Sequence, residues 1–571
     1  MSVIGLKKAN CMNCYKCVRV CPVKSIRVHN EQAEIIEEEC ILCGRCLEAC
    51  PQNAKVLYSD LELVKSFLRE EKKVFVSLAP SFLGSFECKE PGQMVNALKK
   101  LGFYDVCETA QGAVMVTDEY YKLLVKGQMD NIVTTCCPTV NALAEKYYCE
   151  VLPYMAPVVS PMIAHGKMLK EKYGREIKVV FIGPCISKKA EAADIRHDDA
   201  VDAVLTFEEL SSWMLEKGIF PSTLEADSFS GTDPKVARRY PISAGIIKSL
   251  LSKGGLNGYQ TITISGIEQV KLVFEALKNN KLHKTFIEIN ACPEGCINGP
   301  AVNGEPYEFF GAQQKIKRYS TADTSAYPVF RHQVGMQKQF VDRRAKEPIP
   351  DEATIRGILK RIGKETEEQE LNCGSCGYPS CRDKAIAVFQ NKAQLSMCMP
   401  YMNEMTQSLS NVVLAYTPNI IIAVNQDMKI VEFNHAAESA FHLTRKDALN
   451  RELSDIIDDE NFRKVLLSKQ DVTDLKADYP EFGLKTSQDI IYVPKHQVII
   501  GFLQDITQEE AREQKAYKLK MDTMEMAQKV IDKQMMVAQE IASLLGETTA
   551  ETKVTLTKLK KTIIYDGEEE K

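Results

Sequence analysis

Short apolar runs separated by amphipathic stretches characterise the chain between residues 74 and 293. The runs have the length of strands and are rich in Val, Ile and Phe, and the stretches between them show helical spacing. They comprise residues 74–79, 131–138, 178–185, 203–207 and 285–293. Strands that alternate with helices predict an α/β region with largely parallel sheets. In such folds, sites form in the loops beyond the carboxyl ends of the strands.

A different pattern occupies residues 411–507, which contain no cysteine. Residues 419–441 are expected to form strand, turn, strand and helix, and residues 497–507 end the segment with a further strand. Together they resemble a PAS domain, an α+β fold. His435 and His442 fall on and just after the expected helix. Haem binding is one alternative for them, and surface or capping positions are the interpretation that we favour.

The segment 509–571 is predicted to be helical, with apolar residues at alternating steps of three and four around the polar Gln528. These residues are Tyr517, Met521, Met524, Ile531, Met535, Ala538, Ala542 and Leu545. A heptad seam of about four repeats favours a coiled coil between two copies. An amphipathic helix packed on its own PAS domain is the alternative. The segment has no histidine, so we expect its signal to pass to a partner rather than through an internal histidine kinase.

Length and charge narrow the class of protein. At 571 residues the chain should contain several domains. A net charge of −5 and a pI of about 6.1 point neither to nucleic acid nor to a membrane surface. The apolar runs fall short of the roughly 18 residues that span a bilayer, and a cysteine motif begins where a secretory signal would lie. The expected location is the reducing cytoplasm.

Twenty cysteines are the strongest chemical signal, and eight of them form two copies of one spacing within residues 1–50. Each copy reads C-x2-C-x2-C-x3-C-P, the run of two-cluster ferredoxins, in which the fourth cysteine ligates the other copy's 4Fe–4S cluster. Disulfides and structural zinc are the alternatives, but zinc sites favour pairs of cysteine pairs. The expected division is Cys11, Cys14, Cys17 with Cys50, and Cys40, Cys43, Cys46 with Cys21.

A third set of cysteines reads C-x2-C-x4-C-x16-C and comprises Cys373, Cys376, Cys381 and Cys398. Gly374 and Gly377 permit tight turns that direct backbone N–H groups toward cluster sulfurs. Zinc is again the alternative, although a lone fourth cysteine does not match its paired spacing. The segment resembles the small 4Fe–4S domain of several redox proteins, and its place in the chain suits an outward electron relay.

Five further cysteines lie at the ends of three of the predicted strands. They are Cys136, Cys137, Cys185, Cys292 and Cys296. On spacing alone, buried structural thiols are an equal alternative to a cluster. The surrounding residues read TTCCPTV (134–140), PCISKKAE (184–191) and EINACPEGCINGP (288–300). In this order they resemble the three signature segments of the catalytic domain of iron–iron (FeFe) hydrogenases.

That resemblance implies an H-cluster, in which a 4Fe–4S cubane is joined to a diiron unit with carbonyl, cyanide and a bridging dithiolate. Its cubane ligands would be Cys137, Cys185, Cys292 and Cys296. By the same resemblance, Cys296 would bridge to the diiron unit, Lys188 would hydrogen-bond a cyanide, and Cys136 would pass protons. Gly183, Asn290 and Glu191 would surround the cofactor. Hydrogenase maturation proteins would be needed to supply it.

Two of these positions depart from the pattern of catalytic family members, which usually carry methionine there. Gly183 is expected to leave space or water beside the diiron unit, and Asn290 to add hydrogen-bonding groups. Glu119 is a candidate for a proton relay, and a solvated helix position is its alternative. Similar departures mark the sensory branches of the family.

Three functions follow from these patterns. The leading one is an H2 or redox sensor that signals through its PAS domain to a kinase or a PP2C-type phosphatase. The second is a metabolic hydrogenase with a ferredoxin-like redox partner. The third is an iron–sulfur redox or scaffold protein that lacks the diiron unit. Cys136, Lys188 and Cys296 argue against the third, because they serve only the diiron chemistry.

The same patterns divide the chain into five predicted domains. They are an α+β two-cluster ferredoxin domain (1–60), an α/β hydrogenase-like catalytic domain (61–345), a small helical 4Fe–4S domain (346–404), an α+β PAS domain (405–508) and the C-terminal helix (509–571).

Overall fold

The computed structural model describes residues 3–302, 308–320, 327–330, 333–345 and 347–545, together with residues 554 and 558. The chain forms two compact units, residues 1–402 and 403–571. The first unit holds all of the cysteines, and the second holds the cysteine-free segment.

The N-terminal segment of the first unit is a small α+β fold, as predicted. Two antiparallel strand pairs frame it: β1 (Ile4–Leu6) with β4 (Lys55–Leu57), and β2 (Ile26–His29) with β3 (Gln32–Ile35). Two short helices, α1 (Lys16–Val20) and α2 (Arg45–Glu48), contain Cys17 and Cys46. The two copies of the cysteine spacing therefore adopt matching local structures.

Two parallel sheets form the α/β region, which confirms the predicted fold class. The four-stranded sheet has the order β6–β5–β8–β9, and the three-stranded sheet has the order β10–β11–β7. Their bounds are β5 (Val74–Leu78), β6 (Asp105–Glu108), β7 (Asn131–Val133), β8 (Lys178–Gly183), β9 (Ala203–Thr206), β10 (Gln260–Ser265) and β11 (Thr285–Asn290). Every residue of β5 and β11 is buried, as expected where helices cover both faces of a parallel sheet.

Five of these seven strands lie in the predicted runs. The sequence pattern missed β6 and β10, because neither is a continuous apolar run: β6 reads DVCE, and β10 reads QTITIS and is half-exposed. Their polar residues interrupt the apolar signal that identifies a buried strand.

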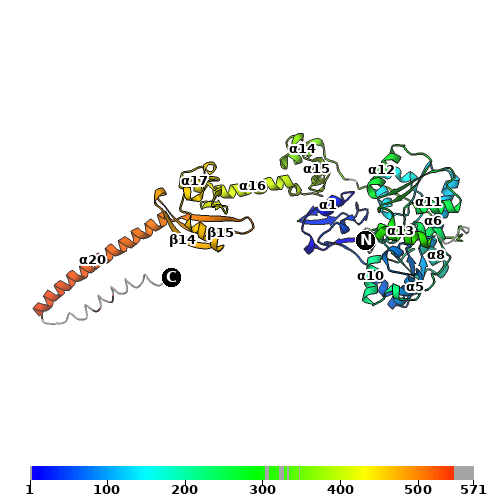
Figure 1. Cartoon of the computed structure of the whole chain (residues 1–571), viewed down its shortest axis with the longest axis horizontal. Helices are drawn as coiled ribbons and strands as arrows, with labels where there is room; N and C mark the ends of the chain where they lie inside the picture. Colours follow the sequence, from blue (N-terminus) through cyan, green and yellow to red (C-terminus); the bar gives the residue numbers. More distant parts are fainter. Residues whose placement is uncertain are drawn as a thin grey trace. The chain divides into compact units, whose positions relative to one another are not determined.

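Helices connect the strands and pack around the sheets (Figure 1). They are α3 (Leu61–Arg69), α4 (Phe82–Ser85), α5 (Gly92–Lys100), α6 (Ala110–Lys126), α7 (Pro138–Tyr147), α8 (Pro161–Tyr173), α9 (Ser187–Ala192), α10 (Phe207–Glu216), α11 (Gly245–Lys253), α12 (Ile267–Lys278) and α13 (Phe309–Tyr319). The start of α10 is set by a capping box, in which Thr206 and Glu209 satisfy each other's backbone N–H groups.

The first unit ends in a small helical segment. Helices α14 (Glu352–Arg361) and α15 (Cys381–Phe389) pack together through Ile355, Leu359 and Ala385. Helix α16 (Met399–Tyr416) begins at the residue after Cys398 and continues into the second unit.

The second unit contains a five-stranded antiparallel sheet of order β13–β12–β16–β15–β14. Its strands and helices are β12 (Ile420–Val424), β13 (Ile430–Phe433), α17 (His435–Phe441), α18 (Arg445–Ala448), α19 (Glu460–Ser468), β14 (Val472–Tyr479), β15 (Leu484–Val493) and β16 (Val498–Asp505). The predicted order of strand, turn, strand and helix over residues 419–441 is confirmed, as is the last strand. His435 is exposed and pairs with Glu438, and His442 ends α17 in the left-handed conformation.

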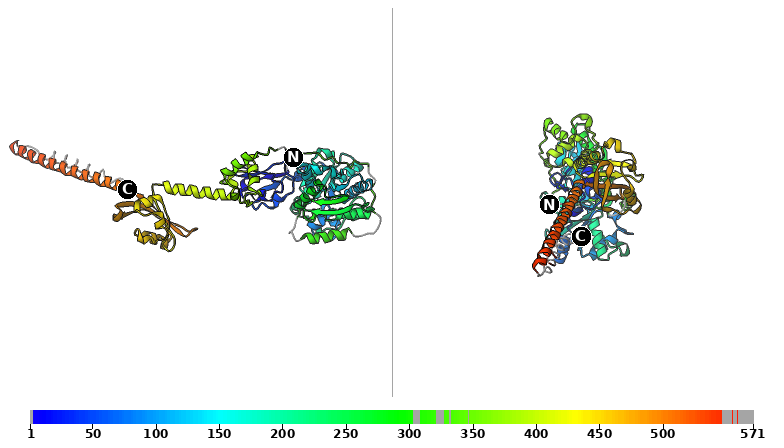
Figure 2. Two further views of the ribbon diagram at one scale, coloured as in Figure 1. Left: turned by 90° about the horizontal axis from the view of Figure 1, so that it is seen from above. Right: turned by 90° about the vertical axis from the view of Figure 1, so that its left-hand side faces the viewer.

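Helix α20 (Thr507–Leu545) follows β16 as one continuous helix (Figure 2). Along the expected seam, Tyr517 and Met521 are exposed, and Met524, Ile531 and Met535 are half-exposed. The side chains of Ala542 and Leu545 lie outside the described residues. Among the helices that the structure describes, none has both the length and the apolarity needed to cross a membrane.

Candidate functional site

Three strand ends meet at the candidate site. Strands β7 and β11 are neighbours in one parallel sheet, and β8 belongs to the other. Beyond their carboxyl ends come Cys136 and Cys137, Cys185, and Cys292 with Cys296. The carboxyl ends of parallel strands lie at one edge of a sheet, so the fold gathers cysteines that are far apart in sequence.

All five cysteines line one cavity of about 40 Å³, as the sequence predicts for a shared site. The thiols of Cys137 and Cys185 both interact electrostatically with that of Cys296. Burial, followed by the charge of Cys137, raises the pKa of Cys185 to about 11. Cys137 also precedes Pro138, the first residue of α7, so it lies at the N-terminus of that helix.

A second cavity of about 90 Å³ adjoins the first and shares with it Cys136, Cys185, Cys296, Lys188 and Asn290. Its remaining lining is mainly apolar and includes Pro80, Ala113, Met162, Phe181 and Ile246. An apolar space bordered by a few polar groups is typical of a cofactor site.

Lys188 is a buried side chain and not an exposed surface lysine. Its Nζ lies 2.6 Å from Glu191 Oε2 and donates to the carbonyl of Cys136 at 3.2 Å. Burial by itself lowers the pKa of Lys188, but the charges of Glu191 and Cys185 outweigh it and raise the pKa above its ordinary value. Lys188 therefore remains a cation at the edge of the cavity.

Glu191 is held by two groups that the sequence analysis did not identify. Ser160 Oγ donates to Glu191 Oε2 at 2.9 Å, and Lys338 Nζ lies 3.7 Å from Oε1. Burial raises the pKa of Glu191, but Lys188 and Lys338 outweigh it, so that the net shift is downward. The carboxylate thus fixes the position of Lys188 rather than acting as an acid.

Cys136 has a hydroxyl neighbour, Tyr120, which the sequence analysis also missed. Tyr120 Oη lies 3.3 Å from Cys136 Sγ and accepts the backbone N–H of Thr135 at 2.9 Å. Because that N–H occupies the acceptor side of the hydroxyl, its proton can point at the sulfur. Burial raises the pKa of Cys136 to about 12, although the Tyr120 hydrogen bond and Lys188 act in the opposite direction.

Glu119 precedes Tyr120 but does not reach the site. It pairs with Lys122 on the same helix at 2.6 Å and is absent from the lining of both cavities. The alternative of a solvated helix position therefore holds for Glu119. Helical spacing could have identified Tyr120. It lies four residues, about one turn, after the buried Val116 and therefore on the same inner face of α6.

The structure contradicts the expectation for Gly183 and agrees with the expectation for Asn290. Gly183 does not leave open space, contrary to expectation: a Cβ at this position would fall 2.6 Å from the ring of Phe181. Residues 181 and 183 point to the same face of β8, so the larger side chain fills the room. Asn290 lines both cavities, and its buried Nδ2 has no hydrogen-bond partner in the described part of the chain, so a donor faces the site.

The second run of ferredoxin-type cysteines forms a compact group. Cys40, Cys43, Cys46 and Cys21 line a cavity of about 10 Å³, and the other three thiols all act on the pKa of Cys46, which burial raises. In the first run, Cys11 and Cys14 interact with Cys17. Lys55 interacts with both Cys17 and Cys50. The structure thus brings Cys21 to the second run.

The third set also surrounds one cavity, of about 20 Å³, lined by Cys373, Cys376, Cys381 and Cys398. In the described residues, no three His, Cys, Asp or Glu side chains converge on a point suited to a single metal ion. A 4Fe–4S cluster differs from a single ion, because each thiolate binds a separate iron and the ligands therefore surround a volume.

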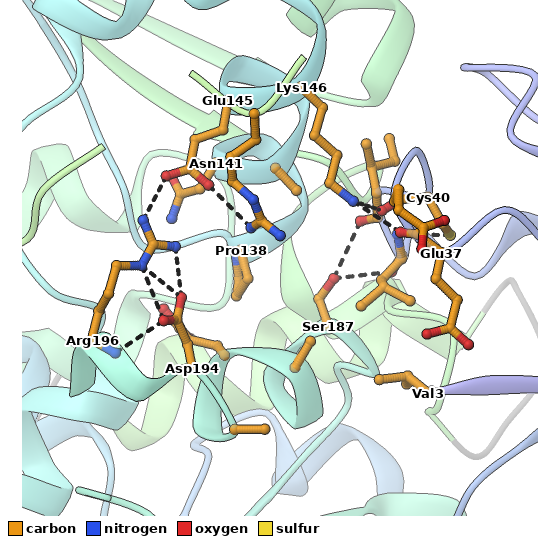
Figure 3. A pocket seen from close by; sticks show the side chains of 18 of the residues that line it. Val3, Glu37, Cys40, Pro138, Asn141, Glu145, Lys146, Ser187, Asp194 and Arg196 are labelled. Carbon is orange, nitrogen blue, oxygen red and sulfur yellow. Dashed lines mark hydrogen bonds and ion pairs between the residues drawn. The ribbon is translucent and has the colours of Figure 1, made fainter. Parts of the chain in front are cut away.

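A larger pocket of about 610 Å³ lies at the seam between the N-terminal segment and the α/β region (Figure 3). Lys146 of α7 donates to the carbonyls of Glu37 and Cys40, at 3.1 and 2.8 Å. Ser187 of α9 donates to the carbonyl of Leu42 at 3.0 Å. These bonds hold the loop of residues 37–42 against α7 and α9. Cys43, the next residue, consequently lines the five-cysteine cavity.

Comparison with known families agrees with this geometry. The family described as "Iron only hydrogenase large subunit, C-terminal domain" matches residues 72–300. A 4Fe–4S dicluster domain matches residues 4–51, an Fe–S cluster family matches residues 369–400, and the PAS fold matches residues 407–506.

Similar proteins include hydrogenases and an assembly factor. Iron hydrogenase 1 of Clostridium pasteurianum is 28% identical over 375 residues, which cover 53% of this chain and 65% of that protein, less than two thirds of its length. Cytosolic iron-sulfur assembly component 3 of Rattus norvegicus is 24% identical over 326 residues, 45% of this chain and 68% of that protein. A solved [FeFe]-hydrogenase of Chlamydomonas reinhardtii has 17% identity and a TM-score of 0.39, with 50% of this chain and 100% of that chain covered. The chain therefore carries a domain of the iron-only hydrogenase family, preceded by a 4Fe–4S dicluster domain and followed by a PAS fold.

Proposed function

We propose that this protein cleaves or forms H2 at an H-cluster, relays electrons through 4Fe–4S clusters, and serves as an H2 or redox sensor whose output passes through the PAS domain. The observation that carries the proposal is the convergence of five cysteines and Lys188, from three separate strand ends, on two adjoining cavities.

The residues present fit the H-cluster. Cys137, Cys185, Cys292 and Cys296 would hold the cubane, and Cys296, which lines both cavities, would bridge to the diiron unit. The apolar cavity has donors at its edge, because Lys188 is a cation there and Asn290 Nδ2 has no partner among the described residues. When bound, the cofactor supplies the heterolytic chemistry of H2.

The surrounding residues hold donors and a proton carrier in place. Glu191 fixes the Lys188 ammonium, which can donate to an anionic ligand such as cyanide without reorganising. The Cys136 thiol lies at the same cavity, and the Tyr120 hydroxyl orients its sulfur. Cys136 is therefore placed to exchange a proton with a base inside the cavity.

The sensor role rests on the domains that follow the site. Helix α16 begins immediately after Cys398, and the same helix leads into the PAS fold at β12. A cluster ligand and the signalling domain thus share one continuous stretch of chain. A metabolic hydrogenase would need neither the PAS fold nor the long helix α20. A kinase or PP2C-type phosphatase would receive the signal, in the cytoplasm.

A non-enzymatic role is the second candidate, and the similarity to an iron–sulfur assembly component favours it. In that case the four cubane cysteines would hold a cluster, but the cavity beside Lys188 and Cys136 would have no diiron unit to receive.

Infrared spectroscopy separates these functions. The protein produced together with hydrogenase maturation proteins is expected to show iron-bound carbonyl and cyanide bands. Cys296→Ala should lose them, and Cys88→Ala, whose sulfur lies outside both cavities, should keep them. Absence of the bands from the parent protein would leave the non-enzymatic role. Bands together with turnover as fast as that of a metabolic hydrogenase would contradict the sensor role.

A further inference from the structure

The small helical segment that holds the third cysteine set is docked on the ferredoxin-type segment, and both belong to the first compact unit (Figure 1). Arg19 donates to the carbonyl of Ser375 at 3.0 Å, and the backbone N–H of Val28 donates to the carbonyl of Lys392 at 2.9 Å. Gly377 packs so closely that a Cβ there would fall 2.8 Å from Val18 Cγ1.

Charged contacts secure the same interface. Lys392 Nζ lies 2.7 Å from Glu39 Oε2 and 2.5 Å from Glu347 Oε2. Glu39 is the residue before Cys40, so this ion pair joins the third set's segment to the second ferredoxin-type run. A buried pair of this kind is costly to break, because each partner would leave an uncompensated charge.

Tyr378 lies between the two cysteine sets. It is 3% exposed, and its hydroxyl has no hydrogen-bond partner among the residues that the structure describes. Tyr378 lines the cavity of the third set and belongs to the same buried cluster as Cys21 and Val18 of the ferredoxin-type segment, so it lies where the two sets meet. A buried tyrosine hydroxyl usually has a partner, and a cluster sulfur on either side would provide the missing acceptor.

We propose that electrons pass between the cluster of the third set and the ferredoxin-type cluster that includes Cys21, across Tyr378, whose hydroxyl donates to a cluster sulfur. One electron leaves a reduced cluster, which returns from the 1+ to the 2+ state, and reduces its neighbour from 2+ to 1+. No proton moves and no bond changes.

The same ferredoxin-type cluster would also serve the candidate site, because Cys43 lines the five-cysteine cavity and Cys21 belongs to the same group. It would therefore be a junction that connects the site, the remaining ferredoxin-type cluster and the route toward the PAS domain. The inference rests on the proposed cluster loading but not on the diiron unit.

Electron paramagnetic resonance of the full chain, reconstituted with 4Fe–4S clusters and without the diiron unit, tests this order. Full reduction should give a signal broadened by spin–spin interaction between the neighbouring clusters. Cys381→Ala removes one ligand of the third set and should narrow the signal, leaving only the interactions among the remaining clusters. A difference between parent and Cys381→Ala equal to the signal of one isolated cluster would overturn the proposal.

Tyr378→Phe provides a second test that does not depend on losing a cluster. Removal of a donor to a cluster sulfur should shift the midpoint potential of one of the two clusters to a more negative value, because hydrogen bonds to the sulfurs help set that potential. The broadening should remain. Tyr58→Phe removes an exposed hydroxyl from the same ferredoxin-type segment and should leave the potentials unchanged. Unchanged potentials in Tyr378→Phe would remove Tyr378 from the route. Failure of the proposed H2 chemistry would instead appear as missing carbonyl and cyanide bands.

Discussion

The ring of Phe181 occupies the space into which a side chain at Gly183 would project, with 2.6 Å between Phe181 Cε1 and the position of a Cβ on Gly183. Both residues lie on β8 and face the apolar cavity side of the sheet, because side chains two apart on a strand share a face. The glycine is thus part of a packed arrangement and not a vacancy.

We therefore expect Gly183→Met to destabilise the α/β region by about 1–3 kcal/mol, the usual cost of overpacking a core. Phe181→Ala alone should cost about 3–5 kcal/mol through the cavity that it leaves. The double variant should cost less than the sum by at least about 1 kcal/mol, because the new methionine fills that cavity. Urea unfolding followed by the fluorescence of Trp213, the single tryptophan and a buried core residue, measures each value.

A glycine without neighbours supplies the control for this comparison. Gly311 on α13 has no atom of the described residues within 4 Å of its potential Cβ, so Gly311→Met should leave the stability unchanged or raise it slightly. If Gly183→Met is as stable as the parent, that result would contradict the claim that Phe181 fills the space beside residue 183.

Cys136→Ala should keep the carbonyl and cyanide bands but lose about a hundredfold or more of H2 activity, which is the usual contribution of a positioned proton carrier. Tyr120→Phe, which removes only the hydroxyl 3.3 Å from the sulfur, should have a smaller effect in the same direction. Cys88→Ala is the matched control. Full activity of Cys136→Ala would exclude the thiol from proton transfer.

Stability should depend on pH through Glu288. Burial raises the pKa of this carboxyl to about 7, even though backbone N–H groups at the start of α11 act in the opposite direction. Between the ordinary carboxyl pKa and pH 7, the folded state therefore binds a proton that the unfolded state has lost. The contribution of Glu288 to the free energy of unfolding is fully present at lower pH. It is lost as the pH rises to about 7, and its size is about 3 kcal/mol at most.

Glu288→Gln should flatten this dependence, because a neutral amide oxygen can still accept the N–H of Ile247 that Glu288 Oε2 accepts at 2.9 Å. Urea titrations at pH 5, 6 and 7.5, again followed by Trp213, measure the slope. Glu119→Gln changes a carboxyl that pairs with Lys122 on the helix surface, and should keep the slope of the parent. A parent slope of opposite sign would contradict the ionisation assigned to Glu288.

Helix α20 should pair with a second copy through its heptad seam. Ile531→Asp places a charge on the seam and should convert a dimer to a monomer in analytical ultracentrifugation of the full chain. Lys533→Asp changes the charge two residues away, off the seam, and should leave the dimer intact. A parent chain that is monomeric at all concentrations would favour the alternative, in which the helix packs on its own PAS domain.

Local sequence information was sufficient for the parts of this protein that depend on backbone geometry. The apolar runs identified β5, β7, β8, β9 and β11, because buried parallel strands need continuous apolar residues. The fixed cysteine spacings identified the runs at Cys11 and Cys40, since ligands a few residues apart are brought together by a short loop and one helical turn. The three signature segments identified the candidate site.

Tertiary structure alone decided which distant groups complete these sites. Tyr120 meets Cys136 because α6 packs beside the end of β7, and Lys338 reaches Glu191 from far along the chain. Phe181 fills the space at Gly183, although the signature segment suggested an opening. Arg19 and Ser375 are 356 residues apart, and their contact joins the third cysteine set to the ferredoxin-type segment. Such contacts arise from the packing of whole helices and strands. The local sequence therefore locates the cysteines, but it does not show which distant side chains contact them or which cysteine sets lie next to each other.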